Sequence, residues 1–368
     1  MSWILVALSL LYGGPILAFA IGHRRVIRAS SKISTELRRC VVIIAARNEE
    51  SVIEKCLKSV LAQSEVSEVI VVDDHSGDRT ASIVAAMQAD YSGRLRLEQL
   101  SDTSGKKAAI GMGIDSSTSE VLLLTDADTL VPPNWAKHML SCFDENTGFV
   151  VGPVIFKNQS GLISKMMSLE WLGFMGIAAG AVGLGRPILC SGANLAYRRS
   201  AFEEVGGYSG IEHLSSGDDE LLMHRVADQT HWRVRYCAHR DAIVETAGPE
   251  SAAAFLEQRR RWASKGGSYE RKWLIAMNFG FWIFFLALPV SLIASIWISA
   301  LRIPVLVALF IKICPEFILL FQSARFFRQK NLLATLIPAQ PLQVAYVIWA
   351  GAAGMKGNFE WKSRSLDR

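Results

Sequence analysis

The stretch LLLTDADTL, residues 122–130, decides the fold expected for this chain. Its aliphatic first half predicts a buried strand, and the strand leads directly into two acids, Asp126 and Asp128. Carboxylates at the end of a buried strand are costly unless water or a positive group neutralises them. The segments around this stretch therefore have to supply both a sheet and a cationic partner.

Strands and helices alternate around this stretch. Aliphatic runs predict strands at 41–46, 69–74 and 94–100, and helix-like segments follow the first two of them. This alternation is typical of an α/β fold with parallel strands and crossover helices. In such sheets the carboxyl ends of the strands meet along one edge, and ligands bind in the crevice there.

Acids follow three of the predicted strands at that edge. Glu49 follows the first strand, Asp73 and Asp74 close the second, and Asp126 and Asp128 follow a later one. Because converging carboxylates repel each other, we expect a divalent cation between them. Mg²⁺ or Mn²⁺ would suit Asp126 and Asp128, since these ions bind one or two carboxylates together with phosphate oxygens. An isolated D-x-D pair could also simply begin a turn before the prolines that follow.

Glycine-rich nucleotide motifs of the common kinds are absent from the sequence. Neither G-x-x-x-x-G-K-[ST] nor a strand followed by G-x-G-x-x-G occurs, which argues against a P-loop and a dinucleotide site. The stretch SGKKAAIGMG (104–113) instead begins a predicted helix with Lys106 and Lys107. Positive charge at a helix N-terminus opposes the helix dipole, and a nearby diphosphate would offset that cost.

The composition predicts membrane segments. The chain is 51% hydrophobic with a mean hydropathy of +0.25. Residues 1–22 contain no charged residue and are expected to form an anchor, and residues 274–301 form a second uncharged run. Residues 303–321 and 331–355 are interrupted by charged, proline or glutamine residues, so two or three spans are expected in 274–368. Lys312 and Glu316 would share a helix face and neutralise each other.

Basic residues indicate the orientation in the membrane. Arg and Lys cluster after the first span and before the second, which predicts that residues 23–273 are cytoplasmic. The six cysteines form no C-x-x-C pair, in agreement with a reducing compartment. The net charge of +5 suits anionic lipid headgroups, and no nucleic-acid-binding motif is present. We expect an integral membrane protein of the bacterial inner membrane with a cytoplasmic catalytic domain.

The apolar segment 160–185 is expected to be an interfacial helix. Its length would allow a membrane span, but a span here would put Asp128 and Asp219 on opposite sides of the membrane. A helix lying against the lipid headgroups keeps both acids in one compartment.

An ordered set of motifs between about residues 40 and 262 carries a resemblance to a known family. The motifs are AARNEE, VVDDHSGDRT, SGKKAAIGMG, LLLTDADT, CSGANLAYRRSAFEEVGGY, SGDDELL and QRRRW. In this order they resemble the family 2 inverting glycosyltransferases with a GT-A fold, and more narrowly the membrane-bound branch with a Q-x-x-R-W motif. The resemblance implies a mixed α/β sheet with flanking helices and a hexosyltransferase-type enzyme that depends on a divalent metal.

The resemblance also implies roles for particular residues. A nucleoside diphosphate sugar would be bound by Ala46, Glu49, Asp73, Asp74, Lys106 and Asp126. Asp126 and Asp128 would hold Mg²⁺ or Mn²⁺ on the diphosphate. The acceptor would contact Gly192, Asn194 and Asp218. Asp219 would be the general base, and Gln258, Arg261 and Trp262 would complete the catalytic set.

Two of these motifs also have structural interpretations. Residues 217–220 could be a helix N-terminus, where acids favour the dipole, and residues 258–262 could be a basic anchor at the membrane surface. The chain departs from the common family pattern at Gly111, where Asn is usual, at Asp218, where Glu is usual, and in the tail sequence WKSR. None of these differences removes a charged group that the chemistry needs.

The expected function is therefore a membrane-bound inverting glycosyltransferase. It would move a sugar from a nucleoside diphosphate sugar, most simply a UDP-sugar, to a lipid-linked or polysaccharide acceptor. Membrane lipids would surround its apolar segments. A processive polysaccharide synthase is an alternative that the Q-x-x-R-W motif favours and the small number of spans disfavours. A non-catalytic membrane partner with a retained fold is the other alternative, and the intact acids argue against it.

Overall fold

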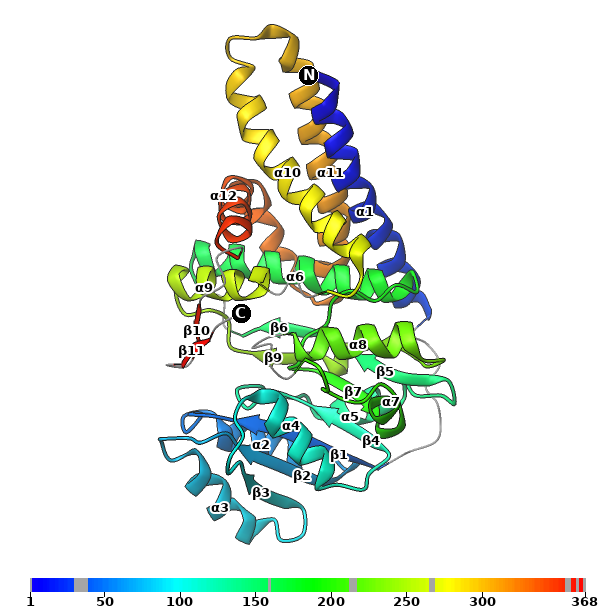
Figure 1. Cartoon of the computed structure of the whole chain (residues 1–368), viewed down its shortest axis with the longest axis vertical. Coiled ribbons are helices and arrows are strands. Elements are labelled where there is room, and N and C mark those ends of the chain that lie inside the picture. The colour runs from blue at the N-terminus through cyan, green and yellow to red at the C-terminus, as the bar shows by residue number, and fades with distance from the viewer. Residues whose placement is uncertain are drawn as a thin grey trace.

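A seven-stranded mixed sheet forms the centre of the chain (Figure 1). The computed structural model describes residues 2–29, 39–157, 160–211, 217–264, 269–354, 359–361 and 364–366. In spatial order the strands are β3 (Leu95–Gln99), β2 (Val66–Asp73), β1 (Cys40–Ala46), β4 (Val121–Leu124), β7 (Leu195–Arg198), β5 (Thr147–Val151) and β8 (Arg233–Tyr236).

The strands predicted from the aliphatic runs are confirmed, and they are parallel to one another. Ala46 at the end of β1 pairs with Asp73 at the end of β2, so both strands deliver their following residues to the same edge. The second half of the sheet differs from the parallel arrangement that the pattern predicted. Strand β7 runs antiparallel to both β4 and β5, which makes the sheet mixed, as the family resemblance implied.

Alternating side chains of the strands enter two cores. Val42 and Ile44 of β1 pack on one face, against α2 (Ile53–Leu61), α3 (Thr80–Asp90) and α5 (Trp135–Leu140). Val41 and Ile43 pack on the other face, against α4 (Lys106–Asp115), α7 (Arg199–Glu204) and α8 (Asp218–Gln229). This period of two is what a strand buried on both faces requires.

Two small sheets complete the strands. Strand β6 (Val154–Phe156) pairs in parallel with β9 (Val244–Thr246), and an isolated bridge from Leu130 to Glu245 ties β9 to the loop after β4. Strands β10 (Phe359–Trp361) and β11 (Arg364–Leu366) form an antiparallel pair near the C-terminus. The β9 connection matters for the site, because it brings Thr246 beside the acids that follow β4.

Three long helices stand together away from the sheet (Figure 1). They are α1 (Ser2–Ala29), α10 (Lys272–Ala294) and α11 (Arg302–Phe326). Tyr12, Phe284 and Phe285 pack between them, whereas Trp3, Val290 and Phe310 point outward with 71%, 67% and 70% of their surface exposed. Large apolar side chains exposed in this number suit a lipid environment. Among the described residues, five helices are long and apolar enough to cross a membrane.

The other two of these five helices are α6 (Leu162–Gly183) and α12 (Leu336–Gly354). Figure 1 shows α6 running across the long bundle, between it and the sheet, with α9 (Ala252–Ser264) beside it. Helix α12 is seen nearly end-on there and does not follow the direction of the bundle. Helices α1 and α6 cross closely, since a Cβ built at Gly22 would lie 2.0 Å from the carbonyl oxygen of Gly180. Such contact needs glycine on both helices.

The helix bounds refine the membrane predictions. Helix α1 continues seven residues past the predicted anchor, which ended at residue 22. After Trp262, where two or three spans were expected, the described residues contain three helices long and apolar enough to cross a membrane. The predicted neutral pair is confirmed, because Lys312 Nζ lies 2.8 Å from Glu316 Oε1 with both side chains buried.

Candidate active site

One cavity of about 1710 Å³ begins at the carboxyl ends of β1, β2 and β4 and extends to the long apolar helices. Its polar end is lined by side chains that follow the strands, and its far end by residues of α6, α10 and α12. The chain enters the polar end through two strained turns, since Asn48 and His75 have positive φ values of 54° and 55°. Strained residues of this kind are concentrated at functional sites.

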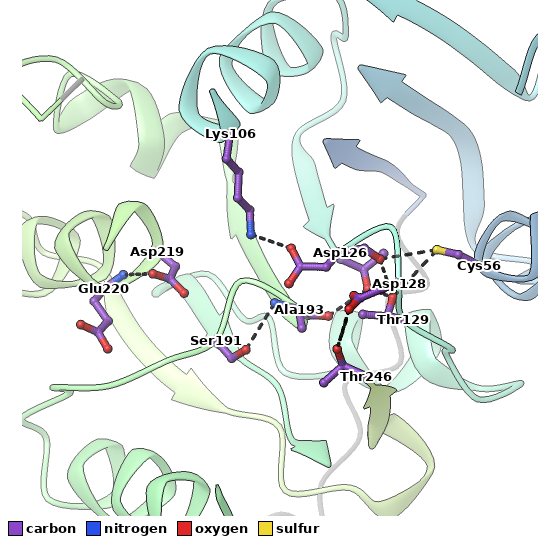
Figure 2. Close-up of polar contacts among 11 residues, drawn as sticks. Cys56, Lys106, Asp126, Asp128, Thr129, Ser191, Ala193, Asp219, Glu220 and Thr246 are labelled. Atoms are coloured by element: carbon purple, nitrogen blue, oxygen red, sulfur yellow. Dashed lines mark hydrogen bonds and ion pairs between the residues drawn. The ribbon is translucent and has the colours of Figure 1, made fainter. Parts of the chain in front are cut away.

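Lys106 lies between two groups of acids that line the polar end, Asp126 with Asp128 after β4 and Asp218 with Asp219 at the start of α8. Its Nζ lies 2.5 Å from Asp126 Oδ1 (Figure 2). Burial alone would lower the pKa of Lys106, but the carboxylates of Asp126, Asp218 and Asp219 outweigh it and raise the pKa above its usual value. The lysine predicted from the SGKKAAIGMG stretch therefore remains charged and lies among the acids.

Asp128 lies beside Asp126 in an unfavourable electrostatic environment. Thr246 Oγ1 of β9 donates to both of its carboxylate oxygens at 3.3 Å (Figure 2). Burial, followed by the charges of Asp126 and Glu49, raises the pKa of Asp128 to about 6. A carboxylate held in this state gains from a cation. Asp126 and Asp128 thus fit a hard divalent ion completed by phosphate oxygens.

The loop before β7 separates the two groups of acids (Figure 2). Thr125 Oγ1 donates to the Ala193 carbonyl at 2.9 Å and fixes this loop to the end of β4. A Cβ built at Gly192 would lie 2.6 Å from Lys106 Nζ and 3.6 Å from Asp219 Oδ2. Gly192 is therefore the point where the lysine and the predicted base come together, and any side chain there would displace the lysine.

Asp218 and Asp219 occupy the first turn of α8, directly after Gly217, whose φ is +88°. The backbone N–H of Glu220 donates to Asp219 Oδ1 at 2.9 Å (Figure 2). The structural interpretation of residues 217–220 as a helix N-terminus is thus correct, and the same residues also line the cavity.

Helix α9 closes the cavity with the Q-x-x-R-W residues Gln258, Arg261 and Trp262. Burial lowers the pKa of Arg261, and the charges of Asp218, Asp219 and Asp126 oppose that shift. Arg261 therefore supplies a second cation among the same carboxylates. Trp262 packs near Trp171 and Phe174 of α6, with ring centroids 5.9 and 5.8 Å apart.

The cavity brings together the predicted site residues with two exceptions. Its walls contain Ala46, Glu49, Asp74, Lys106, Asp126, Asp128, Gly192, Asp218, Asp219, Gln258, Arg261 and Trp262. Asp73 is not among the lining residues. It is buried, and its Oδ2 accepts a hydrogen bond from the Ser76 backbone at 3.1 Å, so it shapes the turn after β2.

Asn194 also differs from its predicted place in the acceptor site. Its side chain is fully buried and accepts from Trp135 Nε1 at 2.8 Å. Its amide donates to the carbonyls of Pro153 and Ala242, both at 2.9 Å. These three bonds commit the side chain to the core beneath the Gly192 loop. The assignment of Asn194 to acceptor contact is therefore corrected to a supporting role.

Other cavity residues were not predicted. Thr246 holds Asp128 from 118 positions away along the chain, and Arg47 Nη1 donates to the Asp74 carbonyl at 3.2 Å. No local motif marks Thr246. Tyr269 also lines the cavity and donates to Glu220 Oε2 at 2.9 Å.

A separate cluster of potential metal ligands lies outside the cavity. His138, His239 and Asp241 offer ligand atoms within 4.8 Å of one another, the only such group among the residues that the structure describes. The two imidazole rings are stacked with centroids 3.3 Å apart and planes inclined by 12°. Their nitrogen lone pairs therefore lie in nearly parallel planes and do not converge on a common ion. We do not assign the predicted metal to this cluster.

Comparison with known proteins agrees with the geometry. Residues 41–206 match the model of the family described as Glycosyl transferase family 2. The Poly-beta-1,6-N-acetyl-D-glucosamine synthase of Staphylococcus aureus (strain COL) is 25% identical over 240 residues, covering 63% of this chain and 55% of that protein. The synthase of the same name from Staphylococcus epidermidis is 24% identical over 233 residues, covering 61% and 53%. The matched region thus spans about half the length of these relatives.

A solved structure resembles nearly the whole chain. It is the mannosyltransferase PcManGT from Pyrobaculum calidifontis in complex with GDP-Man and Mn²⁺, with a TM-score of 0.58 and 18% identity. The similarity covers 96% of this chain and 98% of that chain. At this identity the likeness concerns the fold, and it confirms the predicted GT-A arrangement with long flanking helices.

Proposed function

We propose that the protein, whose residues 41–206 match the Glycosyl transferase family 2 model, transfers a sugar from a UDP-sugar to a lipid-linked acceptor at the membrane surface. The observation that carries the proposal is the continuous cavity. It joins carboxylates and cations suited to a sugar diphosphate with an apolar end among the membrane helices, and Asp219 and Arg261 lie along its wall.

The donor would occupy the polar end of the cavity. Glu49, beyond the end of β1, and Asp74, beyond the end of β2, are suited to accept hydrogen bonds from a ribose or a uracil. Lys106 and Arg261 supply positive charge for the diphosphate. Asp126 and Asp128 would hold Mg²⁺ or Mn²⁺, which when bound neutralises charge on the departing diphosphate.

Asp219 would act as the general base. It would take the proton from the acceptor hydroxyl as that oxygen attacks the anomeric carbon, with departure of the nucleoside diphosphate from the opposite side. In-line attack inverts the configuration, and a positioned base of this kind contributes roughly a hundred- to ten-thousandfold to the rate. Arg261 would stabilise the negative charge that develops on the leaving group.

The acceptor's lipid tail would occupy the apolar end. This part of the cavity is lined by Leu274, Phe281 and Trp282 of α10 and by Val347 and Ala350 of α12. Such walls gain free energy by covering an isoprenoid or acyl chain. They offer few hydrogen-bonding groups for the hydroxyls of a long glycan.

Processive polysaccharide synthesis is the second candidate. It is supported by the two staphylococcal relatives, whose printed names describe poly-β-1,6-N-acetyl-D-glucosamine synthases. A non-catalytic role is disfavoured because Asp128, Asp219 and Arg261 all line the cavity.

The proposed setting is the bacterial inner membrane with residues 23–273 in the cytoplasm. Nucleotide sugars are made in the cytoplasm, and the basic residues near the ends of α1 and α10 support this orientation. Helix α6 would then lie in the headgroup layer, where Figure 1 shows it between the sheet and the long bundle.

Product analysis tests the proposed function. Membranes that contain the protein are incubated with radiolabelled UDP-sugars, UDP-N-acetylglucosamine among them, and are then extracted with organic solvent. Label in a single glycolipid supports transfer to a lipid, whereas label in an insoluble polymer supports the synthase. Absence of transfer from every nucleotide sugar, in membranes where the protein is folded, would reject both candidates.

A further inference from the structure

Arg259 joins three helices through one carboxylate. It lies in α9 between Gln258 and Arg261, and only 4% of its side chain is exposed. Its Nε donates to both oxygens of Glu170 in α6 at 3.1 Å, and its Nη2 also donates to Glu170. The hydroxyl of Tyr346 in α12 donates to the same carboxylate. Helices α6, α9 and α12 therefore meet at Glu170.

The same guanidinium contacts two residues of the Q-x-x-R-W motif. Its Nη1 donates to Gln258 Oε1 at 2.6 Å, and its Cζ lies 4.3 Å from the centroid of the Trp262 ring. The rings of Phe255 and Phe174 lie 4.3 and 5.3 Å from Cζ. A planar cation can stack on aromatic faces and form directed hydrogen bonds at once, whereas a lysine ammonium cannot satisfy both.

We propose that Arg259 is the positioning residue for this end of the active site. It fixes the Gln258 amide and the Trp262 ring in the cavity wall by anchoring α9 to Glu170 and Tyr346. The inference rests on the proposed transferase function. It adds to that function a residue whose charge anchors α9 to Glu170 of α6. Arg261 has a different place, among the carboxylates of Asp218, Asp219 and Asp126.

The anchor continues into the long bundle through α12. Gln343, one turn before Tyr346, accepts from Lys312 Nζ at 2.7 Å, and Gln340 Nε2 donates to Glu316 at 2.9 Å. Tyr12 of α1 donates to the same Glu316 at 2.5 Å. A ladder of buried polar contacts thus connects α1 and α11 to α12, and α12 to α9. Buried networks of this kind hold one arrangement when every member has a partner.

Substitution of Arg259 and of its anchor tests the proposal. Arg259→Lys and Glu170→Gln are compared with Arg260→Lys, because Arg260 is the next residue of α9 and pairs with the partly exposed Glu257, at 3.4 Å. We expect R259K and E170Q to lower kcat about tenfold or more while the Kd for UDP stays within about twofold of wild type. R260K should leave both values within about twofold. The double variant R259K/E170Q should have a kcat no lower than that of R259K, since both changes break the same Arg259–Glu170 contact.

Hydrogen exchange of residues 252–264 provides a readout that does not need activity. R259K and E170Q should increase exchange in α9 while the sheet strands keep wild-type protection, and R260K should not. Wild-type kcat and wild-type exchange in both R259K and E170Q would overturn the proposal. If wild-type protein transfers no sugar, the proposed function fails, but increased exchange in R259K and E170Q alone still supports the positioning of α9. A global loss of protection in R259K leaves E170Q to decide the question.

Discussion

Replacement of Asn194 by alanine tests whether this side chain stabilises the core or contacts the acceptor substrate. The substitution leaves the buried Trp135 indole N–H and the carbonyls of Pro153 and Ala242 without this partner. Each unsatisfied buried group costs about 1–3 kcal/mol, but the Pro153 carbonyl also accepts from the Val244 backbone and loses less. We expect N194A to lower the free energy of unfolding by about 3–5 kcal/mol.

For a domain of this size, that loss corresponds to a fall in Tm of about 10 °C. Thermal unfolding of detergent-purified protein measures it, with Asn278→Ala as the matched control. Asn278 lines the cavity but is exposed, so its truncation should cost under about 1 kcal/mol. A Trp135→Phe variant should share part of the N194A loss, because the two residues form one contact. The reasoning is refuted if N194A melts like wild type and only the acceptor KM rises.

Two further changes test the site, and a third tests the pH dependence of stability. Gly192→Ala should reduce transfer at least about tenfold, because the added Cβ would meet Lys106 Nζ at 2.6 Å. Steady-state kinetics measure this loss. Unchanged activity would show that transfer does not need Lys106 Nζ beside residue 192. Removal of divalent metal by EDTA should abolish transfer, and added Mg²⁺ or Mn²⁺ should restore it; full activity in excess EDTA would contradict the role of Asp126 and Asp128. Burial and the charge of Arg271 lower the pKa of His224 to about 4, so the fold favours its neutral form. Its contribution to stability is complete above pH 6.5 and is lost as pH falls toward 4, which predicts a loss of about 2 kcal/mol between pH 7 and pH 5. Thermal unfolding at both pH values should show this loss in wild type and a smaller one in His224→Gln, and equal losses would contradict it.

The local sequence pattern predicted the site residues that lie next to the strand or helix that positions them. Asp126 and Asp128 follow an aliphatic strand, and Lys106 begins a helix. The places of these three residues can therefore be predicted from neighbours within a few positions. The four-residue strand β7 is too short for its antiparallel direction to be predicted from periodicity. The interfacial placement proposed for α6 rests on a functional constraint, because its composition alone equally allows a membrane span.

Contacts between distant segments account for what the pattern could not predict. Asn194 has partners 41 to 59 positions away, Thr246 lies 118 positions from Asp128, and Glu170 lies 89 from Arg259. A polar residue in a glycine-containing loop has the same local signature whether it faces a ligand or the core. Only the tertiary fold shows that Asn194 faces the core and that Arg259 contacts Glu170.

The central claim is that the acids on both sides of the Gly192 loop act in one sugar transfer, and Asp219→Asn tests it most directly. Transfer from a UDP-sugar and equilibrium binding of UDP are measured on the same purified preparation. The account predicts transfer reduced by at least about a hundredfold with UDP affinity retained within a few fold. Transfer at the wild-type rate by Asp219→Asn would contradict it.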